Sequence, residues 1–295
     1  MYYAVTHLTV FKYSEPITDS VMEVRLQPRN DECQRCVRFD LEVRPHAKVQ
    51  SYKSHLGNTV HTFDVPGQHD RLAIRSESVV DLKAPSPLPE KLDESAWDRL
   101  DEKSWEPELY DMLLPGTFAR RTTLLTAFAE YVKWGRNSDP LTALRTLNQQ
   151  VYENFDYQQH VTRADSPIDI ALEARQGVCQ DFSHIMIALA RSVGIPSRYV
   201  SGYLYHYKDR HDRSDADASH AWMEAWLPDL GWVGFDPTNN LIVKDRHIRV
   251  ALGNDYADAS PTHGVFRGSA ETELEVFVEV NHLDELPFED TTLAP

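Results

Sequence analysis

The stretch that decides the fold runs from residue 176 to residue 237. It opens with Q-G-V-C-Q-D-F (176–182) and later contains S-H-A-W-M-E-A-W (219–226) and G-W-V-G-F-D-P (231–237). One cysteine, one histidine and one aspartate stand out in these segments, namely Cys179, His220 and Asp236. Each lies in a local pattern that predicts its structural setting.

The cysteine is expected in the first turn of a helix. Gly177 before it permits a tight turn or a positive φ, and Gly194 and Pro196 end the pattern. Between them, apolar residues recur every three or four positions, at Phe182, Met186, Leu189 and Val193. A helix start favours a thiolate through its free N–H groups and its dipole. The same N–H groups are able to hold a developing oxyanion.

The histidine and the aspartate are expected on two neighbouring strands. The aromatic-rich run 219–226 predicts a buried or half-buried strand, Gly231 allows a turn, and residues 232–235 predict the next strand. Such a hairpin brings Asp236 beside His220. A cysteine nucleophile needs a base, and the base needs a third group that fixes its tautomer.

Two rival interpretations use some of the same residues. His184 is five residues after Cys179 on the predicted helix, about 140° away around its axis, so His220 is the preferred base. A zinc site built from Cys179, His184 and His220 is disfavoured by the same helical geometry. We therefore expect no metal and no redox cofactor.

These segments, together with G-I-P-S-R-Y-V-S-G-Y (194–203), resemble the transglutaminase-like superfamily. The match is closest to bacterial transglutaminase-like proteins described as candidate cysteine proteases, and residues 2–80 resemble their β-rich N-terminal region. The resemblance implies an α+β fold, in which an N-terminal β-sandwich precedes a cysteine-protease-like core with the nucleophile helix packed on an antiparallel sheet. It also implies a catalytic triad of Cys179, His220 and Asp236.

The resemblance extends to the reaction and to three further candidate residues. It implies acyl transfer from peptide or protein amides through a thioester, with hydrolysis expected over protein cross-linking. A protein-glutamine transglutaminase and a non-catalytic peptide-binding module are the alternatives. Tyr157, Gln180 and Trp222 are the candidate substrate-binding or oxyanion positions.

Composition limits the partners. The 295 residues carry a formal net charge of −16, which argues against nucleic acid and anionic membrane surfaces. No apolar run approaches the length of a membrane span, and the N-terminal residues lack the plan of a signal peptide. Because three cysteines cannot all pair with one another, we expect no disulfide scaffold. We expect a cytoplasmic protein that acts on peptides or proteins, and its oligomeric state is left open.

The remaining cysteines, Cys33 and Cys36, form a C-Q-R-C pair in the first eighty residues. A structural zinc site needs four ligands, and no second pair exists. A redox pair usually opens a helix, whereas the alternation after Cys36 predicts a strand. Two thiols in a turn, without a special role, is the favoured interpretation.

The expected domain organisation has four parts. Residues 1–83 form the β-rich domain, 84–120 a linker and connecting segment, 121–270 the catalytic core, and 271–295 a final strand and tail. Within the core, helices are expected at 124–134, after Asp139-Pro140, and from Ser166-Pro167, where Asp169 completes a capping box. Alternation at 274–280 predicts a last strand whose sheet is left open.

The polar segment 208–218 directly precedes His220 and is expected to rim the site. Its aspartates, Asp209, Asp212, Asp215 and Asp217, offer calcium ligands, but the spacing and central glycine of a calcium loop are absent. A mobile solvated loop is the preferred interpretation.

Overall fold

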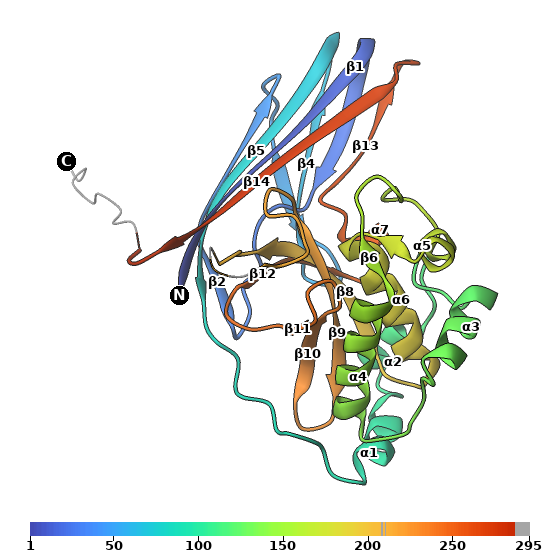
Figure 1. Ribbon diagram of the computed structural model, residues 1–295. Coiled ribbons are helices and arrows are strands. Elements are labelled where there is room, and N and C mark those ends of the chain that lie inside the picture. The colour runs from blue at the N-terminus through green and yellow to red at the C-terminus, as the bar shows by residue number, and fades with distance from the viewer. Residues whose placement is uncertain (208, 210, 287–295) are drawn as a thin grey trace.

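The computed structural model describes residues 1–207, 209 and 211–286. Two regions lie side by side (Figure 1). One is a long curled antiparallel sheet, and the other is a core in which helices cover one side of a second sheet. No helix among the described residues is long and apolar enough to cross a membrane.

The first sheet is built mainly from the N-terminal residues. Its path runs β2-β5-β1-β4-β3, with the bounds β1 Tyr2–Val24, β2 Gln34–Arg44, β3 Gln50–Lys53, β4 Thr59–Val65 and β5 His69–Leu82. The first half of β1 pairs with β5 and its second half pairs with β4. This division lets the sheet curl around a core that includes Ile17, Phe63 and Leu72. The strand expected after Cys36 is confirmed as part of β2, and the β-rich N-terminal region implied by the resemblance is also confirmed.

The C-terminal strands return to the first sheet. Both β13 (Thr262–Arg267) and β14 (Thr272–Leu283) pair antiparallel with β1. Pairing of β14 beside β1, visible as the long diagonal strand in Figure 1, answers the question that the sequence left open. β13 falls within the range 121–270 that we assigned to the catalytic core, yet it completes the first sheet.

Short helices connect the two regions and lead to the core. Their bounds are α1 Ala96–Lys103, α2 Pro107–Tyr110, the 3₁₀ turn Asp111–Leu113, α3 Thr123–Tyr131, α4 Pro140–Asn154 and α5 Ile168–Ala174. Asp139 caps α4 by accepting from the N–H groups of Leu141 and Thr142, with Pro140 at the first helical position, as predicted.

The prediction of a capping box at Ser166 and Asp169 was wrong. Pro167 is the N-cap of α5, and no side chain caps this helix. Ser166 Oγ instead accepts from Arg163 N–H, and Asp169 accepts from Thr122 Oγ. Tertiary contacts with α3 and the preceding loop thus replaced the local motif. The predicted helix at 124–134 also ends earlier, at Tyr131, because Lys133 takes a left-handed conformation.

The second sheet carries the core. Its strand order is β11-β10-β9-β8-β12, with β8 Ser197–Leu204, β9 His220–Leu227, β10 Gly231–Asp236, β11 Leu241–Ile242 and β12 His247–Gly253. Helix α6 (Cys179–Ser192) packs on β8 and β9 through buried residues that include Phe182, Met186 and Met223. Two two-residue strands, β6 (Asp156–Tyr157) and β7 (Gln176–Gly177), pair beside the start of α6, and α7 (Tyr256–Ala259) follows β12.

The two regions share a buried seam. Tyr3 and Val80 of the first sheet pack with Tyr203 and Ile248 of the core. Polar side chains cross the same boundary: Asn58 bonds to the backbone of Leu252, and Gln34 bonds to that of Arg249. The seam therefore contributes directly to the position of β12, which carries part of the site described next.

Candidate active site

Cys179 opens helix α6, as predicted. The N-cap is Val178, and Asp181 folds back so that its Oδ2 accepts from Val178 N–H at 2.9 Å and from the Thr162 hydroxyl. Gly177 is required for a different reason from the one expected. Its φ is not positive, but a Cβ there would lie 2.8 Å from Asp181 Oδ2. The glycine therefore makes room for the carboxylate that holds the helix start.

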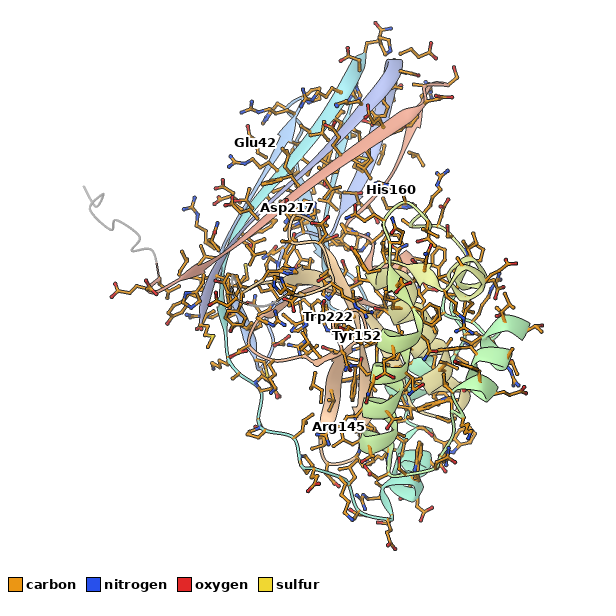
Figure 2. The ribbon with its side chains drawn as sticks, in the orientation of Figure 1. Glu42, Arg145, Tyr152, His160, Asp217 and Trp222 are labelled. Atoms are coloured by element: carbon orange, nitrogen blue, oxygen red, sulfur yellow. The ribbon has the colours of Figure 1, made fainter. Side chains whose placement is uncertain are left out.

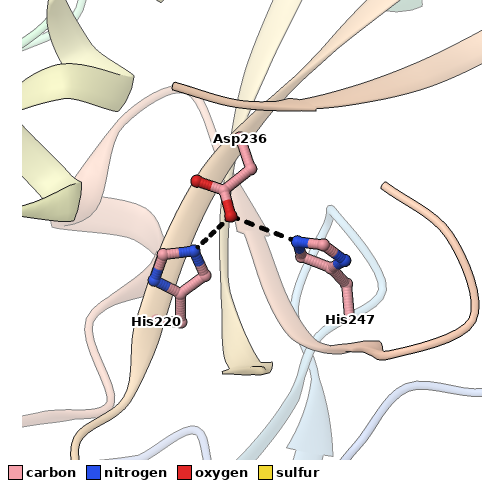
Figure 3. Close-up of side chains that lie close together, drawn as sticks. All are labelled: His220, Asp236 and His247. Carbon is pink, nitrogen blue, oxygen red and sulfur yellow. Dashed lines mark hydrogen bonds and ion pairs between the residues drawn. The ribbon is translucent and has the colours of Figure 1, made fainter. Parts of the chain in front are cut away.

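His220 and Asp236 meet as the predicted hairpin requires. Strands β9 and β10 pair antiparallel, which places the end of β10 next to the start of β9. His220 Nε2 lies 2.8 Å from Asp236 Oδ2 (Figure 3). Both side chains are buried, and among the residues that the structure describes none is hydrogen-bonded to His220 Nδ1. The carboxylate therefore holds the Nε2–H tautomer and leaves Nδ1 free to act on a neighbour.

The charges of this pair stabilise one another. Burial alone would lower the pKa of His220, but the charge and hydrogen bond of Asp236, followed by the interaction with Cys179, raise that pKa to about 10. Burial would likewise raise the pKa of Asp236, but His220 and His247 hold it well below its usual range. The Cys179 thiol is therefore close enough to His220 to favour the imidazolium. An imidazolium and a thiolate are the ionic pair that a cysteine nucleophile needs.

A second histidine reaches the same carboxylate. His247 Nε2 lies 3.2 Å from Asp236 Oδ2, on the opposite side from His220 (Figure 3). The sequence analysis missed His247, because no local motif marks this residue. Asn239 adds two donors to the same carboxylate, because its side chain donates to Asp236 Oδ2 and its N–H donates to Oδ1. Its own Oδ1 accepts from the backbone N–H groups of Arg213 and Ser214.

The three candidate positions around the triad lie in different places. Tyr157 is half-buried on β6, and burial, followed by the charge of Cys179, raises its pKa to about 12, so its hydroxyl stays protonated beside the thiol. Gln180 donates to the Arg163 carbonyl and so fastens the loop before α5. Trp222 is fully buried, with its ring 6.0 Å from that of His220 (Figure 2). Of the three, only Tyr157 is placed by these contacts beside the thiol.

His184 faces away from this arrangement. Its Nε2 accepts from Tyr256 N–H at 3.2 Å, and its ring stacks on Phe118 and Tyr199. Burial lowers its pKa to about 4. His184 is therefore a neutral core residue.

The polar segment before His220 is more firmly held than we expected. Lys208 and Arg210 lie outside the described residues. In the described part, Asp212 pairs with Arg246, Asp215 accepts from Gln159, and Asp217 O accepts from Val278 N–H of β14 (Figure 2). These contacts tie the segment to three other parts of the chain. Of the aspartates considered as calcium ligands, Asp212 and Asp215 thus have separate side-chain partners.

Among the described residues, one group of three metal-ligand side chains lies within 4.8 Å: His220, Asp236 and His247. Their facing atoms are engaged in the hydrogen bonds just described. Neither Cys179 nor His184 belongs to that group. Cys33 and Cys36 are free, half-buried thiols, and burial raises the pKa of Cys36 to about 11.

Comparison with known proteins agrees with this geometry. Residues 127–237 match the transglutaminase-like superfamily, and residues 3–81 match the bacterial transglutaminase-like N-terminal region. An uncharacterized protein of Mycobacterium leprae is 32% identical over 280 residues, which cover 95% of this chain and 98% of that protein. The chain belongs to the transglutaminase-like superfamily. Most of the first sheet lies within the residues that match the bacterial N-terminal region.

Other relatives of this transglutaminase-like protein extend the comparison. An uncharacterized protein of Mycobacterium tuberculosis is 34% identical over 309 aligned positions, covering 99% of this chain and 94% of that one. The solved structure of a candidate cysteine protease from Cytophaga hutchinsonii superposes with a TM-score of 0.75, at 19% identity, over 98% of this chain and 93% of that one. This last likeness shows the fold alone.

One relative with a named activity is similar over part of the chain. A protein-glutamine gamma-glutamyltransferase of Pseudomonas aeruginosa is 33% identical over 152 residues. The match covers 45% of this chain and 21% of that protein.

Proposed function

We propose that this protein is a thiol-dependent acyl-transfer enzyme that cleaves peptide or protein amide bonds. The observation that carries the proposal is the alignment of Cys179, His220 and Asp236. A cysteine begins a helix, a buried histidine interacts with it, and a buried carboxylate 2.8 Å from Nε2 fixes that histidine. Nucleophile, base and orienting group are the three parts that such catalysis needs.

The first half-reaction forms a thioester. Cys179 transfers its proton to His220 Nδ1, and the thiolate attacks the amide carbonyl carbon to form a C–S bond. The tetrahedral oxyanion collapses, the C–N bond breaks, and the leaving amine takes the proton from His220. Asp236 keeps the proton on Nε2 throughout and stabilises the imidazolium, without changing its own protonation.

The second half-reaction returns the enzyme. A water molecule gives a proton to His220 Nδ1 and attacks the thioester, the C–S bond breaks, and the acid leaves as Cys179 regains its proton. Every atom comes from the amide and water, so the step needs no further reactant.

The oxyanion is held at the helix start. The N–H groups of Cys179 and Gln180 open α6, where a helix provides no acceptor for them. The positive end of the helix dipole favours negative charge at the same point. The protonated hydroxyl of Tyr157 is the second candidate donor, because this residue lies beside the thiol.

Hydrolysis is the preferred fate of the thioester. Water is abundant, and amine transfer requires a pocket that holds an amine and excludes water. The fold shared with the candidate protease from Cytophaga hutchinsonii is consistent with hydrolysis. Peptides or proteins in the cytoplasm are the substrates that we propose.

A second function is protein-glutamine transfer. The partial similarity to the Pseudomonas aeruginosa protein-glutamine gamma-glutamyltransferase favours it. In that reaction the same thioester reacts with a primary amine in place of water. A member that binds peptides without catalysis would not need the paired His220 and Asp236.

The experiment that tests the proposal follows products by mass. A glutamine peptide and a general peptide mixture are each incubated with the protein, with and without a labelled primary amine. Cleaved or deamidated peptides support hydrolysis, and efficient amine incorporation with little hydrolysis would establish a transglutaminase. Cys179→Ser is the control, and products that persist in it would contradict both thiol mechanisms.

A further inference from the structure

Asp236 is held by an unusual number of donors. Its Oδ1 accepts from the N–H groups of Thr238 and Asn239 at 3.1 and 3.3 Å. Its Oδ2 accepts from His220 Nε2 at 2.8 Å, Asn239 Nδ2 at 2.9 Å and His247 Nε2 at 3.2 Å. The donors thus include two imidazole rings on one oxygen (Figure 3).

His247 reaches Asp236 from a different part of the fold than Thr238 and Asn239. Thr238 and Asn239 follow Asp236 within three residues, so they belong to the same turn and move with it. His247 begins β12, at the far edge of the second sheet, with β9 and β8 between β12 and β10. Its hydrogen bond therefore fixes the carboxylate relative to the sheet rather than to its own turn.

The ring nitrogens indicate how His247 binds. Its Nδ1 is buried and has no hydrogen-bond partner in the described part of the chain, and the Trp222 ring lies edge-on at 5.2 Å. An imidazolium would leave a buried Nδ1–H without an acceptor, which is costly. Burial also lowers the pKa of His247, which likewise favours the neutral ring. A neutral ring with its proton on Nε2 satisfies the one contact that is made and donates to Asp236.

Other charged groups face this cluster from three elements. They are Cys179 on α6, His206 and Asp212 between β8 and β9, and Arg246 directly before β12. Arg246 and Asp212 form a bidentate pair, so their charges largely cancel.

We propose that His247 is a positioning residue for the thiol site, one that holds Asp236 Oδ2 against His220 by a hydrogen bond donated from β12. This inference rests on the proposed function. His247 does not touch the substrate or the thiol; it acts through Asp236. Without this donor, the carboxylate keeps only the donors of its own turn and His220, and His220 loses its fixed direction toward Cys179.

The first test measures the rate at which iodoacetamide alkylates Cys179 in folded protein. His247→Phe keeps a ring but removes the donor, and we expect the rate to fall about 10- to 100-fold, as for other groups that orient an active residue. His247→Gln places an amide N–H near the former Nε2 and should restore the rate to within about threefold of the natural protein. His69→Phe is the matched control, since it removes a buried, hydrogen-bonded histidine of the first sheet.

The outcomes separate the two proposals. If Cys179 of the natural protein reacts no faster than Cys33, the proposed function fails, and the inference fails with it. If Cys179 reacts fast and folded His247→Phe reacts equally fast, only the inference fails. A rate that falls equally in His247→Phe and His247→Gln would show that ring packing, not the donor, matters, and would also overturn the inference.

A second measurement needs no folded Phe variant. Histidine labelled with ¹⁵N reports directly which ring nitrogen carries the proton, and the signal missing from His247→Gln identifies His247. We expect a neutral ring protonated on Nε2. If only Nδ1 carries a proton, Nε2 is an acceptor and cannot donate to the carboxylate. That result would overturn the inference.

Discussion

Two histidines of the core are buried to the same extent but have opposite acid–base properties. His184 on α6 and His220 on β9 are each 2% exposed. His184 packs among aromatic rings, and burial lowers its pKa to about 4. His220 contacts Asp236, and its pKa rises to about 10 although burial opposes the rise. Burial therefore does not account for the high pKa of His220; the neighbouring carboxylate does.

The largest expected effect comes from removing the base. His220→Ala should reduce turnover by about 10²–10⁴-fold or more, because the proposed mechanism gives the Cys179 proton to His220. Turnover is measured with the peptide that the natural protein cleaves, or joins to the labelled amine, most efficiently. His184→Gln keeps an acceptor for Tyr256 N–H and should retain most of the activity. Full activity in folded His220→Ala, together with loss in His184→Gln, would reverse the assignment.

Removing the charge of Asp236, which contacts His220 and not His184, should reduce turnover less than removing His220. Asp236→Asn preserves the shape of the side chain and one acceptor oxygen, but it no longer stabilises an imidazolium. Turnover should fall strongly yet remain measurably above that of His220→Ala, since the base itself is still present. Activity equal to that of the natural protein would show that the carboxylate has no part in catalysis.

The lowered pKa of His184 should make the free energy of unfolding fall as the pH falls. Its folded pKa lies below the ordinary value of 6.5, so the unfolded chain binds the proton first as the pH falls. Its contribution is present above pH 6.5 and is lost between there and about pH 4. Between pH 7 and pH 5, the free energy of unfolding should fall by about 2 kcal/mol less in His184→Gln than in the natural protein.

Urea unfolding at a series of pH values measures that slope. The same acid-side slope in both proteins would mean that His184 is charged in the folded state. The raised pKa of His220 has the opposite sign: its contribution is complete below pH 6.5 and is lost as the pH rises through about 10.

The smallest effect is expected at the other two cysteines. Cys33→Ser and Cys36→Ser should leave turnover within about twofold, because neither thiol contacts the His220–Asp236 site and surface changes away from special features are small. Loss of activity in either variant, with folding intact, would point to a role that the Cys179 site does not explain.

The sequence predicted the local parts of the site well. The period of apolar residues after Cys179 predicts α6, and the glycine turn at Gly231 predicts the hairpin that joins His220 to Asp236. Both are short-range patterns that the backbone follows directly. The family resemblance was also confirmed.

Long-range contacts were beyond the reach of such patterns. His247 reaches Asp236 from a strand whose neighbours are fixed only by the sheet order, and β14 pairs with β1 across most of the chain. The polar segment before His220 looked solvated because its anchors, such as Arg246 and Asn239, are distant in sequence. At Asp169, a partner on another helix replaced the expected local cap.

The most direct test of the central claim is limited alkylation of the native protein at neutral pH. All three cysteines are half-buried, so exposure alone does not favour one of them. Iodoacetamide should modify Cys179 well before Cys33 and Cys36. This preference should persist in His184→Gln, vanish in His220→Ala and be absent from denatured protein. Equal or reversed labelling of the native protein, measured by peptide mass, would contradict an activated Cys179 and with it the proposed mechanism.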